Sequence, residues 1–137
     1  MPRHPLRLGA ALLFALFILF IVFRANQGDI PEIFRFYKRL PLGDKLGHGG
    51  LMGTLSFLVN WAWQGKVWQL RLGDRAVPLL RGSVVVLTVV SLEEISQAWI
   101  PARTLSWSDW IADVIGITVG GWLAQRFLHR KPPGEKV

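Results

Sequence analysis

The sequence predicts an all-α integral membrane protein, a bundle of four transmembrane helices. Four long apolar runs alternate with polar, mostly basic connections along the 137 residues. Hydrophobic residues make up 51% of the chain, and it contains seven tryptophans, a residue that collects at membrane interfaces. A soluble domain of this length could bury a core without such runs. We expect a single domain over residues 1–128, followed by a basic disordered tail over residues 129–137.

Composition also argues against several classes of function. The chain has no cysteine, so it has neither a disulfide framework nor a thiolate metal site. A net charge of +7 suggests nucleic acid, but neither a stacking module nor a basic helix face accompanies it. The basic residues lie in the connections between apolar runs, as expected near anionic lipid. We therefore expect membrane lipids as partners and no nucleic acid.

Residues 8–24 form the first predicted span. Secretory signals share its pattern of basic residues followed by an apolar run. However, Phe23 and Arg24 stand where a cleavage site needs small residues, which favours an uncleaved transmembrane helix. In the polar stretch that follows, residues 31–40 form either a short amphipathic interfacial helix or an ordinary loop.

Residues 46–64 and 82–100 form the second and third predicted spans. In the second, Gly49 and Gly53 are four residues apart, a spacing that lets two helix backbones approach closely. The third begins with a β-branched run that resembles a strand. Because an open strand in hydrocarbon would leave its backbone groups unpaired, we expect a helix. The basic connection between the two spans, residues 65–81, is predicted to be a loop.

Residues 108–127 form the fourth predicted span. The pattern Ser106-x-x-Asp109 before it is typical of a helix start, where hydroxyl and carboxylate satisfy free amide groups. Gly116 and Gly120 repeat the four-residue spacing of the second span. We therefore expect the second and fourth spans to pack glycine against glycine.

Alternating crossings bring three polar patches to one face of the membrane. The start of the second span, the end of the third and the start of the fourth must lie on the same side. Charged groups at membrane depth are costly, so they are usually paired and often functional. Glu93 also lies in these patches. The candidate ligand-binding residues are Asp44, Lys45, His48, Glu94, Gln97, Arg103, Asp109 and Asp113.

The distribution of lysine and arginine predicts which face this is. With both termini inside, ten basic residues fall in inner segments and six in outer ones. The excess belongs on the cytoplasmic side, so the polar patches should face outward. The inner set is Arg3, Arg7, Lys66, Arg71, Arg75, Arg81, Arg126, Arg130, Lys131 and Lys136; the outer set is Arg24, Arg35, Lys38, Arg39, Lys45 and Arg103.

The three patches also resemble the VanZ-like family. The resemblance covers roughly residues 40–125, with Asp113 in place of the asparagine usual there. It implies a small multi-pass protein of the bacterial inner membrane, and the family is named for a member associated with teicoplanin resistance. Many members have no glycopeptide connection, so the resemblance does not assign resistance to this chain. The matching blocks are Asp44-Lys45-x-x-His48, Glu94-x-x-Gln97-x-Trp99-x-Pro101-x-Arg103 and Asp109-x-x-x-Asp113-x-x-Gly116-x-x-x-Gly120.

Three classes of function are open. In the first, Arg103 and Lys45 bind the head group of a lipid or a cell-envelope precursor at the outer leaflet. In the second, the protein is an intramembrane enzyme acting on a lipid-linked substrate, with His48 as a base and Ser96 or Ser106 as nucleophile. Neither Gly-x-Ser-x-Gly nor His-Glu-x-x-His occurs, so we expect binding rather than catalysis. In the third, the charges only neutralise one another and the protein serves structure or assembly.

No cofactor or metal is predicted, because a single histidine among carboxylates is a poor zinc site. The patches contain more acids than bases, which leaves room for a cation or a basic ligand group and weighs against a simple anion site. The glycine stripes could serve contacts within one chain or between chains, so the sequence leaves the oligomeric state open.

Overall fold

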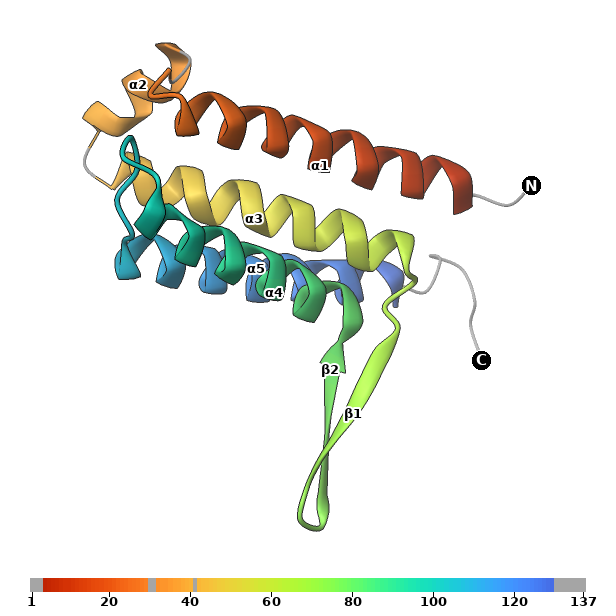
Figure 1. Cartoon of the computed structure of the whole chain (residues 1–137). Helices are drawn as coiled ribbons and strands as arrows, with labels where there is room; N and C mark the ends of the chain where they lie inside the picture. The colour runs from red at the N-terminus through yellow and green to blue at the C-terminus, as the bar shows by residue number, and fades with distance from the viewer. Residues whose placement is uncertain (1–3, 30–31, 41, 130–137) are drawn as a thin grey trace.

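The computed structural model of the protein describes residues 4–29, 32–40 and 42–129 (Figure 1). All of the predicted tail except His129 lies outside these ranges. The chain is mostly helical, as predicted. Its elements in order are α1 (His4–Asn26), α2 (Glu32–Arg39), α3 (Gly43–Ala62), β1 (Val67–Leu72), β2 (Arg75–Leu80), α4 (Arg81–Ser96), the 3-10 turn η1 (Gln97–Trp99) and α5 (Trp107–Leu128).

The four long helices lie side by side and alternate in direction (Figure 1). The contact between α3 and α5 is the most extensive of the bundle; α4 packs on both of them, and α1 packs on α3. The end of α1, the start of α3, the end of α4 and the start of α5 therefore meet at one end of the bundle. This is the convergence of polar patches that alternation predicted.

Glycines set the close approach of α3 and α5. A Cβ atom added to Gly53 would lie 2.8 Å from the carbonyl oxygen of Gly116, and one added to Gly120 would overlap the carbonyl of Gly53. Only residues without a side chain fit there, as the four-residue spacing indicated. Val86, Val90 and Ile117 form the buried apolar core of the bundle.

Within the part of the chain that the structure describes, two helices, Pro5–Asn26 and Trp107–Leu128, are long and apolar enough to cross a membrane. Along α1, large side chains such as Leu13 and Leu16 are 72% and 62% exposed. A water-soluble surface rarely presents an apolar patch of this extent. The third predicted span, 82–100, is not one continuous α-helix. The α-helix α4 has 16 residues and ends at Ser96, and the 3-10 turn η1 follows it.

Residues between α3 and α4 form a β-hairpin, not the loop that we predicted. Strands β1 and β2 pair antiparallel, with Leu72 opposite Arg75 and a two-residue turn at Gly73 and Asp74. Gly73 has φ of +62°, a value that glycine adopts without strain. The hairpin projects from the end of the bundle opposite the polar patches (Figure 1).

A set of buried polar contacts lies inside the bundle, toward the hairpin. Asn60, which is fully buried, donates from Nδ2 to the carbonyl oxygen of Ser56 at 2.8 Å and to Ser83 Oγ at 2.9 Å. Ser56 Oγ in turn donates to the carbonyl oxygen of Ile117 at 2.9 Å. These bonds join α3, α4 and α5, so Asn60 stabilises the interior of the bundle.

In the polar stretch after α1, the helical alternative is the one observed. Residues Glu32–Arg39 form α2, eight residues long, beside the start of α3.

Candidate functional site

A cavity of about 640 Å³ opens at the end of the bundle where the polar patches meet. Its wall toward the bundle centre is apolar and comes from α1, α3 and α4, with residues such as Ile18, Leu51 and Val89. Its other end is charged. The predicted residues that line it are Asp44, Lys45, His48, Gln97, Arg103, Asp109 and Asp113, and Glu93 joins them.

Lys45 is paired with acids from two helices. Its ammonium hydrogen-bonds to Asp109 Oδ1 at the start of α5 and lies 3.6 Å from Asp44 Oδ2 in its own helix. A lysine carries its positive charge at neutral pH, and the two carboxylates stabilise that charge.

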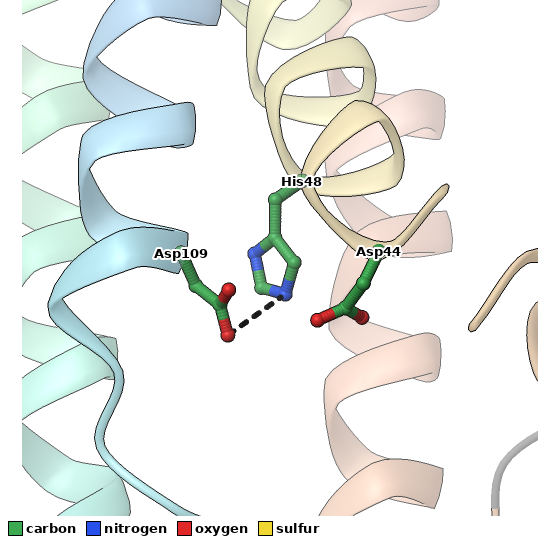
Figure 2. A group of neighbouring side chains, drawn as sticks. All are labelled: Asp44, His48 and Asp109. Carbon is green, nitrogen blue, oxygen red and sulfur yellow. Dashed lines mark ion pairs between the residues drawn. The ribbon is translucent and has the colours of Figure 1, made fainter. Parts of the chain in front are cut away.

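His48 stands between Asp44 and Asp109 (Figure 2). Its Nε2 lies 3.9 Å from Asp109 Oδ2, and its Nδ1 lies 3.4 Å from Asp113 Oδ1. The Asp113 side chain is only 3% exposed. Among the described residues, no hydrogen bond reaches Asp113 Oδ1, so the imidazole is the polar group facing this buried oxygen.

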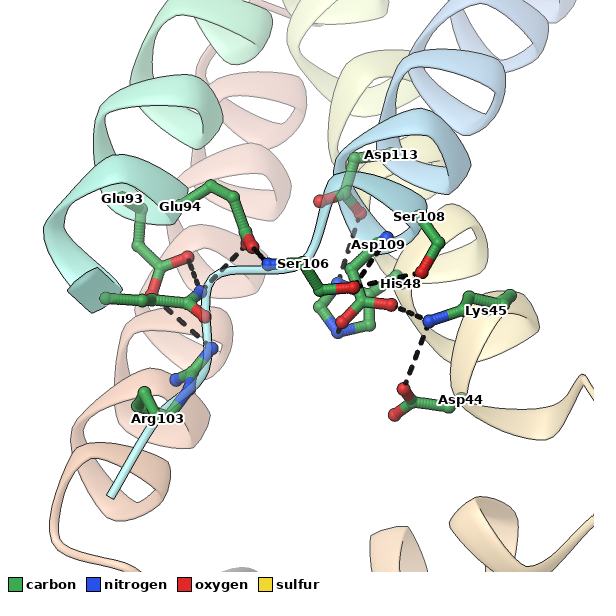
Figure 3. Close-up of polar contacts among 11 residues, drawn as sticks. Asp44, Lys45, His48, Glu93, Glu94, Arg103, Ser106, Ser108, Asp109 and Asp113 are labelled. Carbon is green, nitrogen blue, oxygen red and sulfur yellow. Dashed lines mark hydrogen bonds and ion pairs between the residues drawn. The ribbon is translucent and has the colours of Figure 1, made fainter. Parts of the chain in front are cut away.

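Glu94 closes the loop between α4 and α5 (Figure 3). Its Oε1 accepts the backbone N–H of Ser106 at 2.7 Å, and its Oε2 accepts Gln97 Nε2 at 2.9 Å. Ser106 Oγ in turn accepts the N–H of Asp109 at 3.4 Å, which is the predicted helix cap. Glu94 is buried and does not line the cavity. Its position fits a structural role better than ligand contact.

Glu93, the neighbour of Glu94, has the opposite environment. Its Oε2 accepts Gln97 Nε2 at 2.9 Å, its Oε1 lies 3.7 Å from Arg103 Nη2, and it faces the cavity. Adjacent helical residues point about 100° apart, so one acid of the pair faces inward and the other faces the cavity. The residue type alone does not tell which.

Arg103 links α4 to the end of α1. Besides its approach to Glu93, its Nη1 donates to Asn26 Oδ1 at 3.2 Å, across 77 residues of sequence. Sequence reasoning missed Asn26 because it carries no charge and belongs to no motif. The part of α1 that lines the cavity is also purely apolar, so its share in the site left no signal in the sequence.

The two serines considered as nucleophiles have other partners. Ser96 Oγ donates to the carbonyl oxygen of Glu93 at 2.6 Å, and Ser106 Oγ lies 2.9 Å from Ser108 Oγ. His48 instead faces carboxylates (Figure 3). Among the described contacts of these two serines, none is with His48.

Comparison of the chain with known proteins found no matching family model, no matching curated protein and no matching solved structure.

Proposed function

We propose that this chain is a VanZ-like integral membrane protein whose four long helices cross the bilayer and whose cavity binds a single amphiphile. The observation that supports this most is the cavity itself, which is charged at one end and apolar along the rest of its wall. Its volume of about 640 Å³ is within the range of small-molecule sites. A lipid head group or a cell-envelope precursor would lie at the charged end, with its chain along α1.

Arg103 is the residue best placed to bind an anionic head group. It lines the cavity, its side chain is 16% exposed, and its guanidinium can bind phosphate or carboxylate through two parallel hydrogen bonds. Lys45 lines the same end and supplies a second positive charge. Both residues are paired with acids in the structure, so an anionic head group would replace these ion pairs with its own contacts to Arg103 and Lys45.

The distribution of basic residues supports placing this cavity in the outer half of a bacterial inner membrane, with both termini cytoplasmic. A site there would contact lipids or wall precursors in the outer leaflet. A link to teicoplanin resistance would follow if the bound precursor were the one that glycopeptides recognise.

The test is mass spectrometry of the lipids that the purified protein retains in a nonionic detergent. We expect one anionic lipid to be retained by the wild type and lost from Arg103→Gln. Arg126→Gln is the matched control, because Arg126 lies at the other end of α5 and is exposed. Equal retention by all three proteins would rule out a head-group site at Arg103.

A second pair of variants leaves every charge in place. Ala15 lines the apolar wall, whereas its neighbour Leu16 is 62% exposed on the outside of α1. We expect Ala15→Phe to fill the cavity and reduce lipid retention, while Leu16→Phe leaves it unchanged. Retention by Ala15→Phe would show that the lipid binds elsewhere.

A further inference from the structure

We infer that Asp44, His48 and Asp109 form a binding site for one divalent cation of the Mg²⁺ or Mn²⁺ class at the charged end of the cavity. One ligand atom from each residue can be chosen so that all three lie within 4.8 Å of one another. Figure 2 shows the imidazole between the two carboxylates. All three side chains are partly exposed, and all three line the cavity, so an ion can enter.

Asp113 is the second observation that points to a ligand at this place. Its side chain is 97% buried, and its Oδ1 has no hydrogen bond from any described residue, although it faces His48 Nδ1 at 3.4 Å. Histidines that bind metals commonly present one ring nitrogen to the ion while a carboxylate orients the other. With Asp113 at Nδ1, Nε2 is directed toward Asp109 and the open side of the cluster. Asp113 is thus a positioning residue.

The net charge of the groups that line the cavity also favours binding of a cation. Four carboxylates line it, from Asp44, Glu93, Asp109 and Asp113, against the two cations Lys45 and Arg103, so these six groups carry an excess of two negative charges before His48 is counted. A divalent ion bound through a neutral imidazole would cancel that excess. The bound ion could also accept a phosphate oxygen as a ligand, which would let an anionic head group bind beside the carboxylates. This head-group contact rests on the proposed function, whereas the ion site itself does not.

The ligand set selects the class of ion. Two carboxylates and one imidazole, with water for the remaining positions, suit Mn²⁺ or Mg²⁺, which prefer oxygen ligands. There is no cysteine, and the described part of the site contains one histidine, so a closed structural zinc site is not formed.

Lys45 competes for the same place. Its ammonium forms an ion pair with Asp109 and lies close to Asp44, and these are two of the three proposed ligands. The lysine side chain is flexible and 33% exposed, so it can swing away when an ion enters. Removing this competing charge should therefore strengthen ion binding, a result that a purely structural salt bridge would not produce.

The experiment measures Mn²⁺ binding to the full, chelator-treated chain in nonionic detergent without added lipid, by electron paramagnetic resonance of free Mn²⁺. We expect one Mn²⁺ per chain, displaced by excess Mg²⁺. His48→Gln and Asp109→Asn should abolish binding, and Asp113→Asn should weaken it by about 10–100-fold. Lys45→Gln should strengthen it by roughly 1.4- to fivefold, which corresponds to the 0.2–1 kcal/mol of an exposed ion pair.

Glu93→Gln is the control, since Glu93 lines the cavity but does not belong to the three-residue cluster. It should change Mn²⁺ affinity by less than about threefold, as expected for a screened charge at a distance. An equal loss in Glu93→Gln and Asp109→Asn, weaker binding in Lys45→Gln, or no stoichiometric binding to the wild type would each overturn the inference. Because no lipid is present, these results are independent of lipid retention.

Discussion

Gly116 of α5 lies against the backbone of Gly49 in α3, so closely that a Cβ atom on Gly116 would overlap the carbonyl oxygen of Gly49. This contact and the one between Gly53 and Gly120 hold together the two helices that carry Lys45, His48, Asp109 and Asp113. The geometry of the charged cluster therefore depends on glycine at these positions.

Replacing Gly116 by alanine should separate α3 from α5. The atom in the way is a backbone oxygen, which cannot rotate aside as a side chain would, and overpacking of this kind typically costs about 1–3 kcal/mol. We expect a lower midpoint in denaturant titration of the detergent-solubilised protein. Gly50→Ala is the control, because no atom lies within 4 Å of its added Cβ and alanine favours a helix by about 1 kcal/mol over glycine. Equal stability of the two variants would contradict this packing.

Glu94→Gln should reduce stability without reducing lipid retention. The new amide group would place a donor against the Gln97 amide or the Ser106 N–H, both of which donate to Glu94 in the native protein. A buried group left without its partner costs about 1–3 kcal/mol. Unfolding midpoints and lipid mass spectrometry, measured on the same sample, separate the two effects. Glu32→Gln, on the exposed surface of α2, should leave both unchanged.

Loss of lipid from a stable Glu94→Gln protein would mean that this carboxylate contacts the ligand, and the structural role assigned to it would be wrong.

Gly82 and Asn60 should be energetically coupled. A Cβ atom on Gly82 would lie 2.8 Å from Asn60 Cγ, so Gly82→Ala should destabilise the native protein. In the Asn60→Ala background that side chain is gone, and the cost should shrink by about 0.5–3 kcal/mol, the usual coupling of residues in contact. A double-mutant cycle of unfolding midpoints measures this term. Gly9→Ala, with nothing within 4 Å of its Cβ, should be additive with Asn60→Ala.

Cysteine labelling tests the orientation of the chain. The protein has no cysteine of its own, so each introduced thiol is unique. An impermeant maleimide added to intact cells should label Thr104→Cys, which is exposed at the cavity end, and should label Arg75→Cys on the hairpin only after the membrane is permeabilised. The reverse pattern would place the cavity on the cytoplasmic side and would remove the outer-leaflet ligand from the proposal.

Patterns with a fixed period were readable from the sequence. The four-residue spacing of Gly49, Gly53, Gly116 and Gly120 predicted their contact, and Ser106-x-x-Asp109 predicted the helix cap. The convergence of the polar patches followed from alternation alone. In each case the prediction needed only local geometry or chain direction.

The hairpin was also readable, although we predicted a loop. Residues 67–72 alternate apolar with polar after Val67, and Gly73-Asp74 is a turn sequence for two paired strands. A segment this rich in lysine and arginine is also typical of a loop near anionic lipid, and that pattern competes with the alternation.

Other features depend on tertiary contacts that no local pattern encodes. The bond between Arg103 and Asn26 spans 77 residues, and neither residue's neighbours indicate it. Likewise, Glu93 and Glu94 are chemically identical, and only the packing of α4 against α5 decides that Glu94 is buried and Glu93 lines the cavity.

Arg103 holds the C-terminal end of α1 through Asn26 while it faces Glu93 of α4. A phosphate or carboxylate that captured the guanidinium would withdraw it from both residues at once. The first helix, whose packing within the bundle is chiefly against α3, would then lose a contact at its C-terminal end. If the cavity holds the proposed amphiphile, its occupancy would be coupled to the freedom of α1, which forms one wall of the cavity.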